Sequence, residues 1–336
     1  MAETVTQIEQ RLLVATDTKE QLHLLDELTF LLRDTSPVKM RDYAQKWVTL
    51  AEQTTDQHTQ AIALKRLGTA NLWLANFDQA MHAFQRAREI YTGLDDPLGL
   101  ARCCLNIGLV HRHLESYEQA IQYQKKAVET CEKLLESAQN LHHRQIKQTY
   151  SNAFANLGII FLQQEKYEKA AENYEAALAI NYEMKNKSNI AGLLLNLANT
   201  HWKLGYSEKG IAGLEKAIEL AEELNNQRIL VTALASLGDI YTSKRAYKTA
   251  EKFLHQALEI ADSSGFEEVR KNVLLSLATA NAETGNFKAA FQYFKQHTQA
   301  REKMYNAAAR KQVAELETVH LSRQKEEEME IERLKN

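Results

Sequence analysis

Proline, cysteine and glycine are scarce in this 336-residue sequence. It has two prolines, Pro37 and Pro97, twelve glycines and three cysteines. Because proline and glycine are the residues that interrupt helices, their scarcity beside abundant Ala, Leu, Glu, Lys and Gln predicts an almost entirely helical, all-α chain. The cysteines, Cys103, Cys104 and Cys131, have no zinc or CxxC spacing, so we predict no metal, no cofactor and a reducing compartment.

The sequence also lacks an excess of charge of one sign and a long apolar run. Its formal net charge of -3 gives no reason to expect a nucleic-acid or anionic-membrane surface. No run of about eighteen apolar residues is present, which excludes a membrane-spanning helix. The acidic start MAETVTQIEQ has no apolar stretch of the kind a secretory signal needs. We therefore predict a cytoplasmic protein with no nucleic-acid and no membrane partner.

The sequence contains six copies of one repeat. Each unit has a large residue followed by a small one, at Leu67-Gly68, Ile107-Gly108, Leu157-Gly158, Leu197-Ala198, Leu237-Gly238 and Leu277-Ala278. Successive pairs are 40 residues apart, except for the second and third, which are 50 apart. Apolar residues step by three or four over two stretches of each unit, which is a helical period. Each unit is therefore predicted to be a helical hairpin, with the small residue where two helices cross closely.

Most units place an aromatic residue at the start of the second helix. These residues are Phe77, Tyr117, Tyr167, Tyr247 and Phe287. With the large-small pair and two later alanines, the pattern resembles the tetratricopeptide repeat (TPR) family over about residues 60–300. The resemblance implies an α-α superhelix, a solenoid of stacked hairpins around a concave groove. The 40-residue period exceeds the common period of about 34 and resembles the long-repeat subgroup in bacterial signalling proteins, kinesin light chains and spindle-orientation adaptors.

We predict three parts along the chain. Residues 1–56 form a degenerate N-terminal hairpin that caps the array, and residues 57–302 form six TPR hairpins. Residues 303–336 form an extended charged helix, a candidate coiled coil. The ten additional residues at 131–150 are expected to lengthen the helices on either side of a turn near Asn140.

The residue before each large-small pair is polar and points away from the packed stripe of its helix. It is asparagine in three consecutive repeats, at Asn106, Asn156 and Asn196. An asparagine amide offers a donor and an acceptor that match a peptide backbone, and asparagine is a poor choice for a helix interior without a further reason. The resemblance to long-repeat TPR proteins implies that these three hold an extended peptide. The alternative is that they solvate the helix face or brace neighbouring helices.

Further polar and aromatic residues are expected on the same groove. They are Lys65, Arg66, Arg102, Arg112, His113, Asn152, Asn199, Trp202, Lys203 and Asp239. The basic ones fall in the N-terminal half, which indicates a ligand with acidic side chains. A chaperone-type carboxylate clamp is not predicted, because Thr69 stands where that clamp requires asparagine.

The last segment contains no glycine or proline after Phe294, so the helix is predicted to run on. Its apolar stripe includes Val313, Leu316, Ile331 and Leu334, which we predict to be homodimer contacts of a coiled coil. A solvated charged helix is the alternative. In the bacterial signalling proteins that the chain resembles, such a helix leads from a TPR sensor to an output domain, for example a diguanylate cyclase, histidine kinase or adenylyl cyclase.

The leading hypothesis is a protein- or peptide-binding scaffold that acts as the sensory and dimerising input region of a bacterial cytoplasmic signalling protein. The catalytic output domain would lie outside this chain. One alternative is a free-standing adaptor that holds an extended partner peptide. An intracellular quorum-peptide receptor ranks third, because the N-terminal portion shows no three-helix bundle. The sequence has no GxGxxG, P-loop, HExxH or GxSxG motif, so the chain itself is not predicted to be an enzyme.

Overall fold

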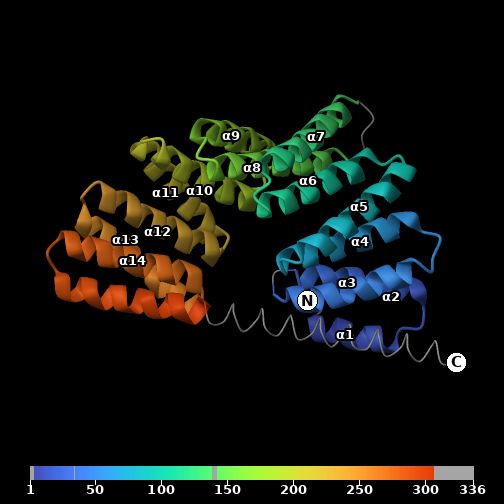
Figure 1. Ribbon diagram of the computed structural model, residues 1–336, viewed down its shortest axis with the longest axis horizontal. Helices are drawn as coiled ribbons and strands as arrows, with labels where there is room; N and C mark the ends of the chain where they lie inside the picture. The colour runs from blue at the N-terminus through green and yellow to red at the C-terminus, as the bar shows by residue number, and fades with distance from the viewer. Residues whose placement is uncertain (1–3, 34, 138–141, 306–336) are drawn as a thin grey trace. The chain divides into compact units, whose positions relative to one another are not determined.

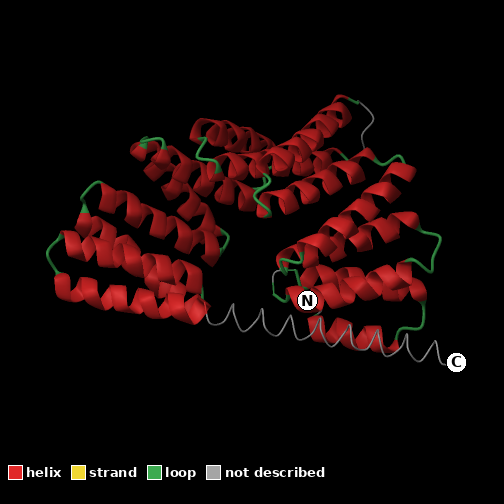
Figure 2. Cartoon of the chain, in the orientation of Figure 1, coloured by secondary structure: helices red, strands yellow, loops and turns green. Residues whose placement is uncertain are grey.

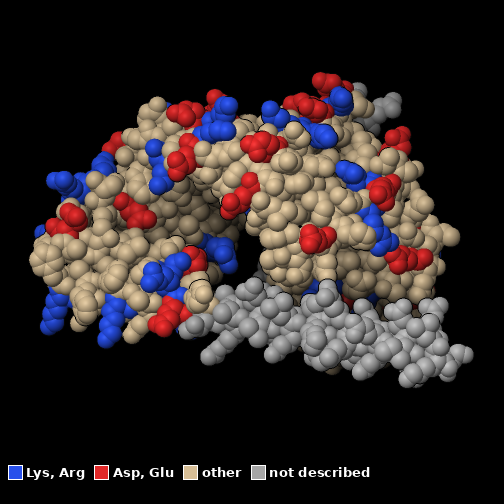
Figure 3. Space-filling view, in the orientation of Figure 1, with Lys and Arg blue, Asp and Glu red and all other residues tan. Residues whose placement is uncertain are grey.

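The computed structural model describes residues 4–33, 35–137 and 142–305, and these residues form helices joined by short turns, without a strand (Figure 2). The all-α prediction is confirmed. Among the described helices, none is both long enough and apolar enough to cross a membrane. On the face shown in Figure 3, basic and acidic side chains are interspersed, in keeping with the small net charge.

The chain divides into two compact units, Met1–Leu193 and Leu194–Asn336. The helices of the first unit are α1 (Val5–Val14), α2 (Thr18–Leu31), α3 (Pro37–Ala51), α4 (Gln57–Trp73), α5 (Phe77–Gly93), α6 (Pro97–His113), α7 (Tyr117–Glu136), α8 (His143–Gln163) and α9 (Tyr167–Glu183) (Figure 1). The remaining helices are α10 (Lys187–Lys203), which begins in the first unit and ends in the second, α11 (Ser207–Glu223), α12 (Gln227–Ser243), α13 (Tyr247–Ser264) and α14 (Glu267–Glu283). Residues 287–305 are helical as well.

The turns and caps of the hairpins follow from local sequence. Three first helices, α4, α6 and α12, begin at an acidic or amide N-cap. The side chains of Asp96 and Asn226 accept hydrogen bonds from the backbone N–H three residues on, at 2.9 and 3.1 Å, which satisfies a donor that the helix leaves free. The turn after a first helix contains one residue with positive φ, such as Glu165 at 58° and Gly205 at 83°. This left-handed residue ends the helix and reverses the chain.

The predicted large-small packing is confirmed. A Cβ atom on Gly68 would lie 2.5 Å from the ring of Phe84, and one on Gly158 would lie 2.6 Å from the ring of Tyr174. Those distances are too short for any real contact, so only glycine allows the first helix to approach the second so closely. The first helices of successive hairpins also pack on each other. Helix α4 packs on α6, α6 on α8, and α12 on α14.

Two features of the first unit differ in length from the regular hairpins. Helices α7 and α8 have 20 and 21 residues, whereas α4, α5 and α6 have 17 each. The additional residues therefore lengthen the helices, as predicted. The turn near Asn140 falls outside the described residues, as does the segment 306–336, including the predicted dimer contacts Val313, Leu316, Ile331 and Leu334.

The N-terminal part contains one helix more than expected. The predicted hairpin corresponds to α2 and α3, and α1 packs on it through a core formed by Ile8, Leu24, Leu28 and Met40. The expectation that this part shows no three-helix bundle was wrong. Helix α1 escaped prediction because it is short and has only one buried residue, Ile8, so its periodicity is weak.

Candidate functional site

The first helices of the first unit present a polar, partly exposed face, which we call the first-helix face. It consists of side chains from α4, α6 and α8 that the hairpin packing leaves uncovered, namely Lys65, Arg66, Arg102, Asn106, Arg112, His113, Asn152 and Asn156. All eight are predicted site residues. The other five predicted residues lie in the second unit and are also at least partly exposed, namely Asn196, Asn199, Trp202 and Lys203 on α10 and Asp239 on α12.

Basic residues form a cluster on this face. Burial, reinforced by the charges of Arg102 and Arg66, lowers the pKa of Lys65 to about 8, so these cations lie within each other's field. Arg66 pairs with Asp26 at 3.4 Å, and Arg102 donates a hydrogen bond to Gln145 at 2.9 Å. Among the described residues, none forms a hydrogen bond or ion pair with the ammonium group of Lys65. The cluster therefore has an unpaired positive charge in a partly desolvated place.

A cavity of about 480 Å³ lies beside this cluster. Arg102 and Gln145 form part of its wall, together with His58, Asp96 and His142. The His58 ring is 3.9 Å from the Asp96 carboxylate, which would be an ion pair only when the histidine is protonated. The cavity therefore has both a fixed cation, Arg102, and an acid at its edge, and it is large enough for a side chain or a short stretch of peptide.

A second polar group lies at the end of α6. The Nη2 atom of Arg112 is 3.0 Å from Nε2 of His113, and His113 stacks on Phe77 with ring centroids 5.8 Å apart. Burial lowers the pKa of both Arg112 and His113. Neither the Nε of Arg112 nor the nearby hydroxyl of Tyr174 has a hydrogen-bond partner. The Arg112 Nε–H and the Tyr174 hydroxyl are therefore hydrogen-bond donors without a partner, and both lie in the same unit as the basic cluster.

The asparagines of the first unit differ from each other. Asn156 donates a 3.4 Å hydrogen bond to the amide oxygen of Gln124, whose amide nitrogen donates to the carbonyl oxygen of Leu105 at 3.0 Å. Asn156 thus braces a fully buried glutamine, which is the alternative role predicted for the three asparagines. Asn106 makes no side-chain hydrogen bond within the described residues, and Asn152 accepts one from Gln148 at 2.9 Å. Asn106 is the asparagine whose amide is fully available.

The second unit has its own polar residues on first helices. The ammonium group of Lys203 lies 5.1 Å from the centre of the Trp202 ring. Asp239 of α12 accepts a hydrogen bond from Ser276, and burial raises the pKa of its carboxyl group. A partly buried acid therefore stands in this unit, in contrast to the cations of the first.

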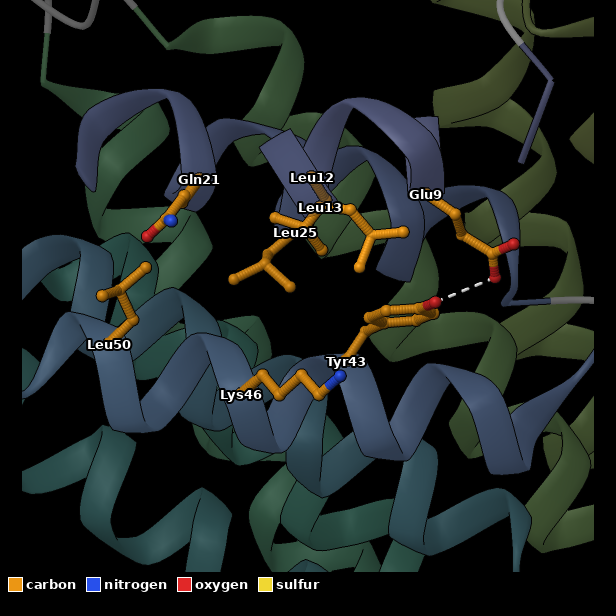
Figure 4. Close-up of a pocket in the computed structure, with 8 residues that line it drawn as sticks. All are labelled: Glu9, Leu12, Leu13, Gln21, Leu25, Tyr43, Lys46 and Leu50. Carbon is orange, nitrogen blue, oxygen red and sulfur yellow. Dashed lines mark hydrogen bonds between the residues drawn. The ribbon is translucent and has the colours of Figure 1, made fainter. Parts of the chain in front are cut away.

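A pocket of about 530 Å³ between α1, α2 and α3 was not predicted from the sequence. Leu12, Leu25 and Leu50 line its apolar part, and Tyr43 closes one end, where its hydroxyl donates to Glu9 at 2.8 Å (Figure 4). Desolvation and this carboxylate raise the pKa of Tyr43 to about 12. Because α1 was not predicted, neither was the pocket. The only sequence signal was the apolar end of that helix, where Leu13 is 85% exposed.

Because the pKa of Lys65 is lowered, we expect the free energy of unfolding to depend on pH in the alkaline range. This pKa is about 8 in the folded chain and about 10.4 when unfolded, so the unfolded state binds more protons between these values. The free energy of unfolding should therefore rise from pH 8 to pH 10. Besides Arg102 and Arg66, the charged or titratable groups near Lys65 are Cys103 and Asp96.

Urea unfolding of Lys65→Met and wild type at several pH values isolates this contribution. The variant should be more stable at pH 7, by about 1 kcal/mol, and the difference should shrink as the pH approaches 10. Lys125→Met, on the exposed side of α7, is the matched control and should parallel wild type throughout. A constant difference between Lys65→Met and wild type would contradict the prediction.

Comparison with known proteins agrees with this architecture. A family model described as tetratricopeptide repeat matches residues 59–133, 101–183 and 189–263, which together make up more than half of the chain. A model described as anaphase-promoting complex subunit 5 matches residues 240–310. No curated protein matches the chain.

Solved structures share the fold at low sequence identity. Aspartyl phosphate phosphatase F from Bacillus subtilis has a TM-score of 0.62 at 17% identity, covering 84% of this chain and 73% of its own. The Rap conjugation gene regulator of plasmid pLS20, in complex with a Phr peptide, has a TM-score of 0.62 at 14% identity, covering 91% and 79%.

A signal-transduction ATPase with a tetratricopeptide repeat sensor, from Pyrococcus horikoshii, has a TM-score of 0.69 at 18% identity. The match covers 90% of this chain and 45% of the ATPase, so this chain spans less than half of that protein. With six hairpins in register, glycines at the helix crossings and three matches of the repeat model, the chain belongs to the tetratricopeptide repeat family.

Proposed function

We propose that the chain is a peptide-binding scaffold whose first-helix face holds an extended peptide with acidic side chains. The observation that carries the proposal is Lys65, which is half-buried, has no partner for its ammonium group among the described residues, and lies beside Arg66 and Arg102. A carboxylate there would remove the like-charge repulsion and form charge-assisted hydrogen bonds, which are about twice as strong as neutral ones. The 480 Å³ cavity at Arg102 provides room for such a side chain.

The asparagines would hold the peptide backbone. Asn106 has its whole amide available, and Asn156 keeps its oxygen free while its nitrogen braces Gln124. Asn196, Asn199 and Trp202 would serve the same purpose on the second unit. Arg112 and His113, at the end of α6, would add donors to a second acidic group or a carbonyl.

In its finer form the proposal makes this scaffold the sensory input region of a cytoplasmic signalling protein. Two fold neighbours support it: one is described as a signal-transduction ATPase with a TPR sensor, and another was solved with a peptide bound. In this form residues 303–336 lead to an output domain, and Val313, Leu316, Ile331 and Leu334 pair in a homodimer. The second candidate, a free-standing peptide receptor or adaptor, is favoured by the three N-terminal helices α1–α3.

Fluorescence anisotropy with fluorescein-labelled heptapeptides tests peptide binding. The probes are a peptide with three glutamates and its match with three lysines. We expect the acidic peptide to bind at least about tenfold more tightly, and Lys65→Ala/Arg102→Ala to lose that preference. Asn106→Ala should weaken binding of both peptides at unchanged stability, whereas Asn156→Ala should also destabilise the fold by about 1–3 kcal/mol, because the Gln124 oxygen loses its partner.

Lys125→Ala, on the second helix α7, is the control and should bind like wild type. Equal affinity for the two peptides, or no change in the Lys65/Arg102 variant, would overturn the acidic-peptide proposal. An antibody to residues 60–300 separates the two candidate roles. A band in the source organism well above the 38.3 kDa of this chain supports the input region, and a band at that mass supports the free-standing receptor.

A further inference from the structure

The helix at residues 287–305 has a stripe of exposed aromatic residues. Phe287, Phe291, Phe294 and Tyr305 are 71%, 69%, 52% and 75% exposed. At 100° per residue, all four project from one side of the helix, within about 40° of a common line. Four large aromatic side chains facing water on one helix face need an explanation, since most such groups are covered.

The repeat register shows what normally covers this side. Counting back from Phe294 by one repeat at a time gives Leu254, Leu214, Tyr174, Gln124 and Phe84, and all of these are 0% exposed. In the hairpin just before, Leu254 packs with Val273 and Leu277 of α14, the first helix of the next hairpin. Leu254 also lies against Gly238 of its own hairpin. The Phe294 side of the helix is therefore where the first helix of its own hairpin and that of a following hairpin would both pack, and no described hairpin follows residues 287–305.

The surface is large enough to drive association. An aromatic side chain buries roughly 150–250 Å² when it is covered, and exposed apolar patches above a few hundred Å² mark interaction sites. Terminal hairpins of repeat arrays normally have a polar outer face for this reason. The last hairpin among the described residues instead has an apolar face, at a position that other hairpins of the chain bury.

Charges beside the stripe indicate which helix fits. Lys295 and Glu302 are exposed, have opposite charges and are two helical turns apart, so they lie on the same flank of the stripe. Neither forms an ion pair within the described residues. If a second, antiparallel helix of the same sequence is centred between Thr298 and Gln299, each lysine faces the glutamate of the other copy, and Phe291 lies within one residue of the position opposite Tyr305.

We propose that two copies of this chain associate through the helices at 287–305, packed antiparallel about a two-fold axis. Such isologous contacts are the commonest arrangement in homo-oligomers, because a self-complementary patch is used twice. The interface needs none of the residues 306–336, so it is distinct from the coiled coil predicted from Val313 and Leu316. It is also independent of peptide binding by the first-helix face.

Sedimentation velocity of the full chain over a micromolar concentration range tests the proposal. Wild type is expected to approach twice the chain mass of 38.3 kDa. Phe291→Glu should raise the dimer dissociation constant at least about tenfold. Gln296→Glu places the same carboxylate about 140° around the helix from Phe291 and should leave the dimer intact. Circular dichroism melts would show that both variants are folded, as expected for exposed positions.

The charge pair gives a second, independent test. Lys295→Glu alone and Glu302→Lys alone should each weaken the dimer through like-charge contacts, and the double variant should restore it, because the two-fold axis pairs position 295 with position 302. A monomeric wild type would overturn the proposal. So would a dimer that survives Phe291→Glu but is lost in Val313→Glu, which would assign association to the tail.

Discussion

Replacement of Tyr174 by alanine is expected to lower the free energy of unfolding by about 3–5 kcal/mol, the range for removal of a large buried aromatic side chain. Tyr174, on α9, is 0% exposed, and its ring fills the space that Gly158 leaves open on α8. Because that glycine has no side chain to move into the cavity, the site cannot collapse. Urea unfolding monitored by circular dichroism measures the loss.

Tyr174→Phe is the matched variant, and its expected effect has the opposite sign. The buried Tyr174 hydroxyl has no hydrogen-bond partner, so the tyrosine bears the cost of desolvating a polar group that gains nothing in return. Phenylalanine keeps the ring and removes the hydroxyl, which should raise the free energy of unfolding by about 1 kcal/mol. A loss in Tyr174→Phe comparable to that in Tyr174→Ala would show that the hydroxyl is bonded in the folded chain.

Gly68→Ala is expected to destabilise the first unit by about 1–3 kcal/mol, although alanine is the better helix former. A Cβ atom at this position would meet the ring of Phe84 at 2.5 Å, and Phe84 is itself 0% exposed. The ring has no free space, so α4 and α5 would have to move apart.

Gly93→Ala makes the same chemical change in the neighbouring helix α5, where the added methyl group has nothing within 4 Å. Here only helix propensity acts, and we expect a gain of about 0.5–1 kcal/mol. Comparing the urea midpoints of the two variants separates packing from propensity. If both variants were stabilised, the helix crossing at Gly68 would be looser than the structure shows.

The repeat architecture could be predicted because its signals are local and periodic. A large-small pair such as Leu157-Gly158 reports a helix crossing, and an aromatic residue such as Tyr167 marks the start of the second helix, which is where α9 begins. Each signal depends on contacts within one hairpin. Because the pattern repeats six times in register, few other folds are compatible with the sequence.

The site was harder to predict from the sequence because it depends on contacts between hairpins. Nothing local distinguishes Asn156, which braces Gln124, from Asn106, which makes no side-chain hydrogen bond within the described residues. The lowered pKa of Lys65 arises from burial and from the charge of Arg102, 37 positions away in the sequence. Helix α1 and its pocket were missed because one buried residue, Ile8, leaves no period to detect.

Gln124 also bears on how the array could change in evolution. It stands where the other hairpins have Phe84, Tyr174, Leu214 or Leu254, and its amide is satisfied by Leu105 in its own hairpin and by Asn156 in the next. A duplicated or deleted hairpin at this junction would leave the buried amide oxygen without the donor that Asn156 supplies, whereas apolar contacts elsewhere tolerate a new neighbour of similar shape. Gain and loss of repeats should therefore be accepted more readily at the apolar junctions than next to α7.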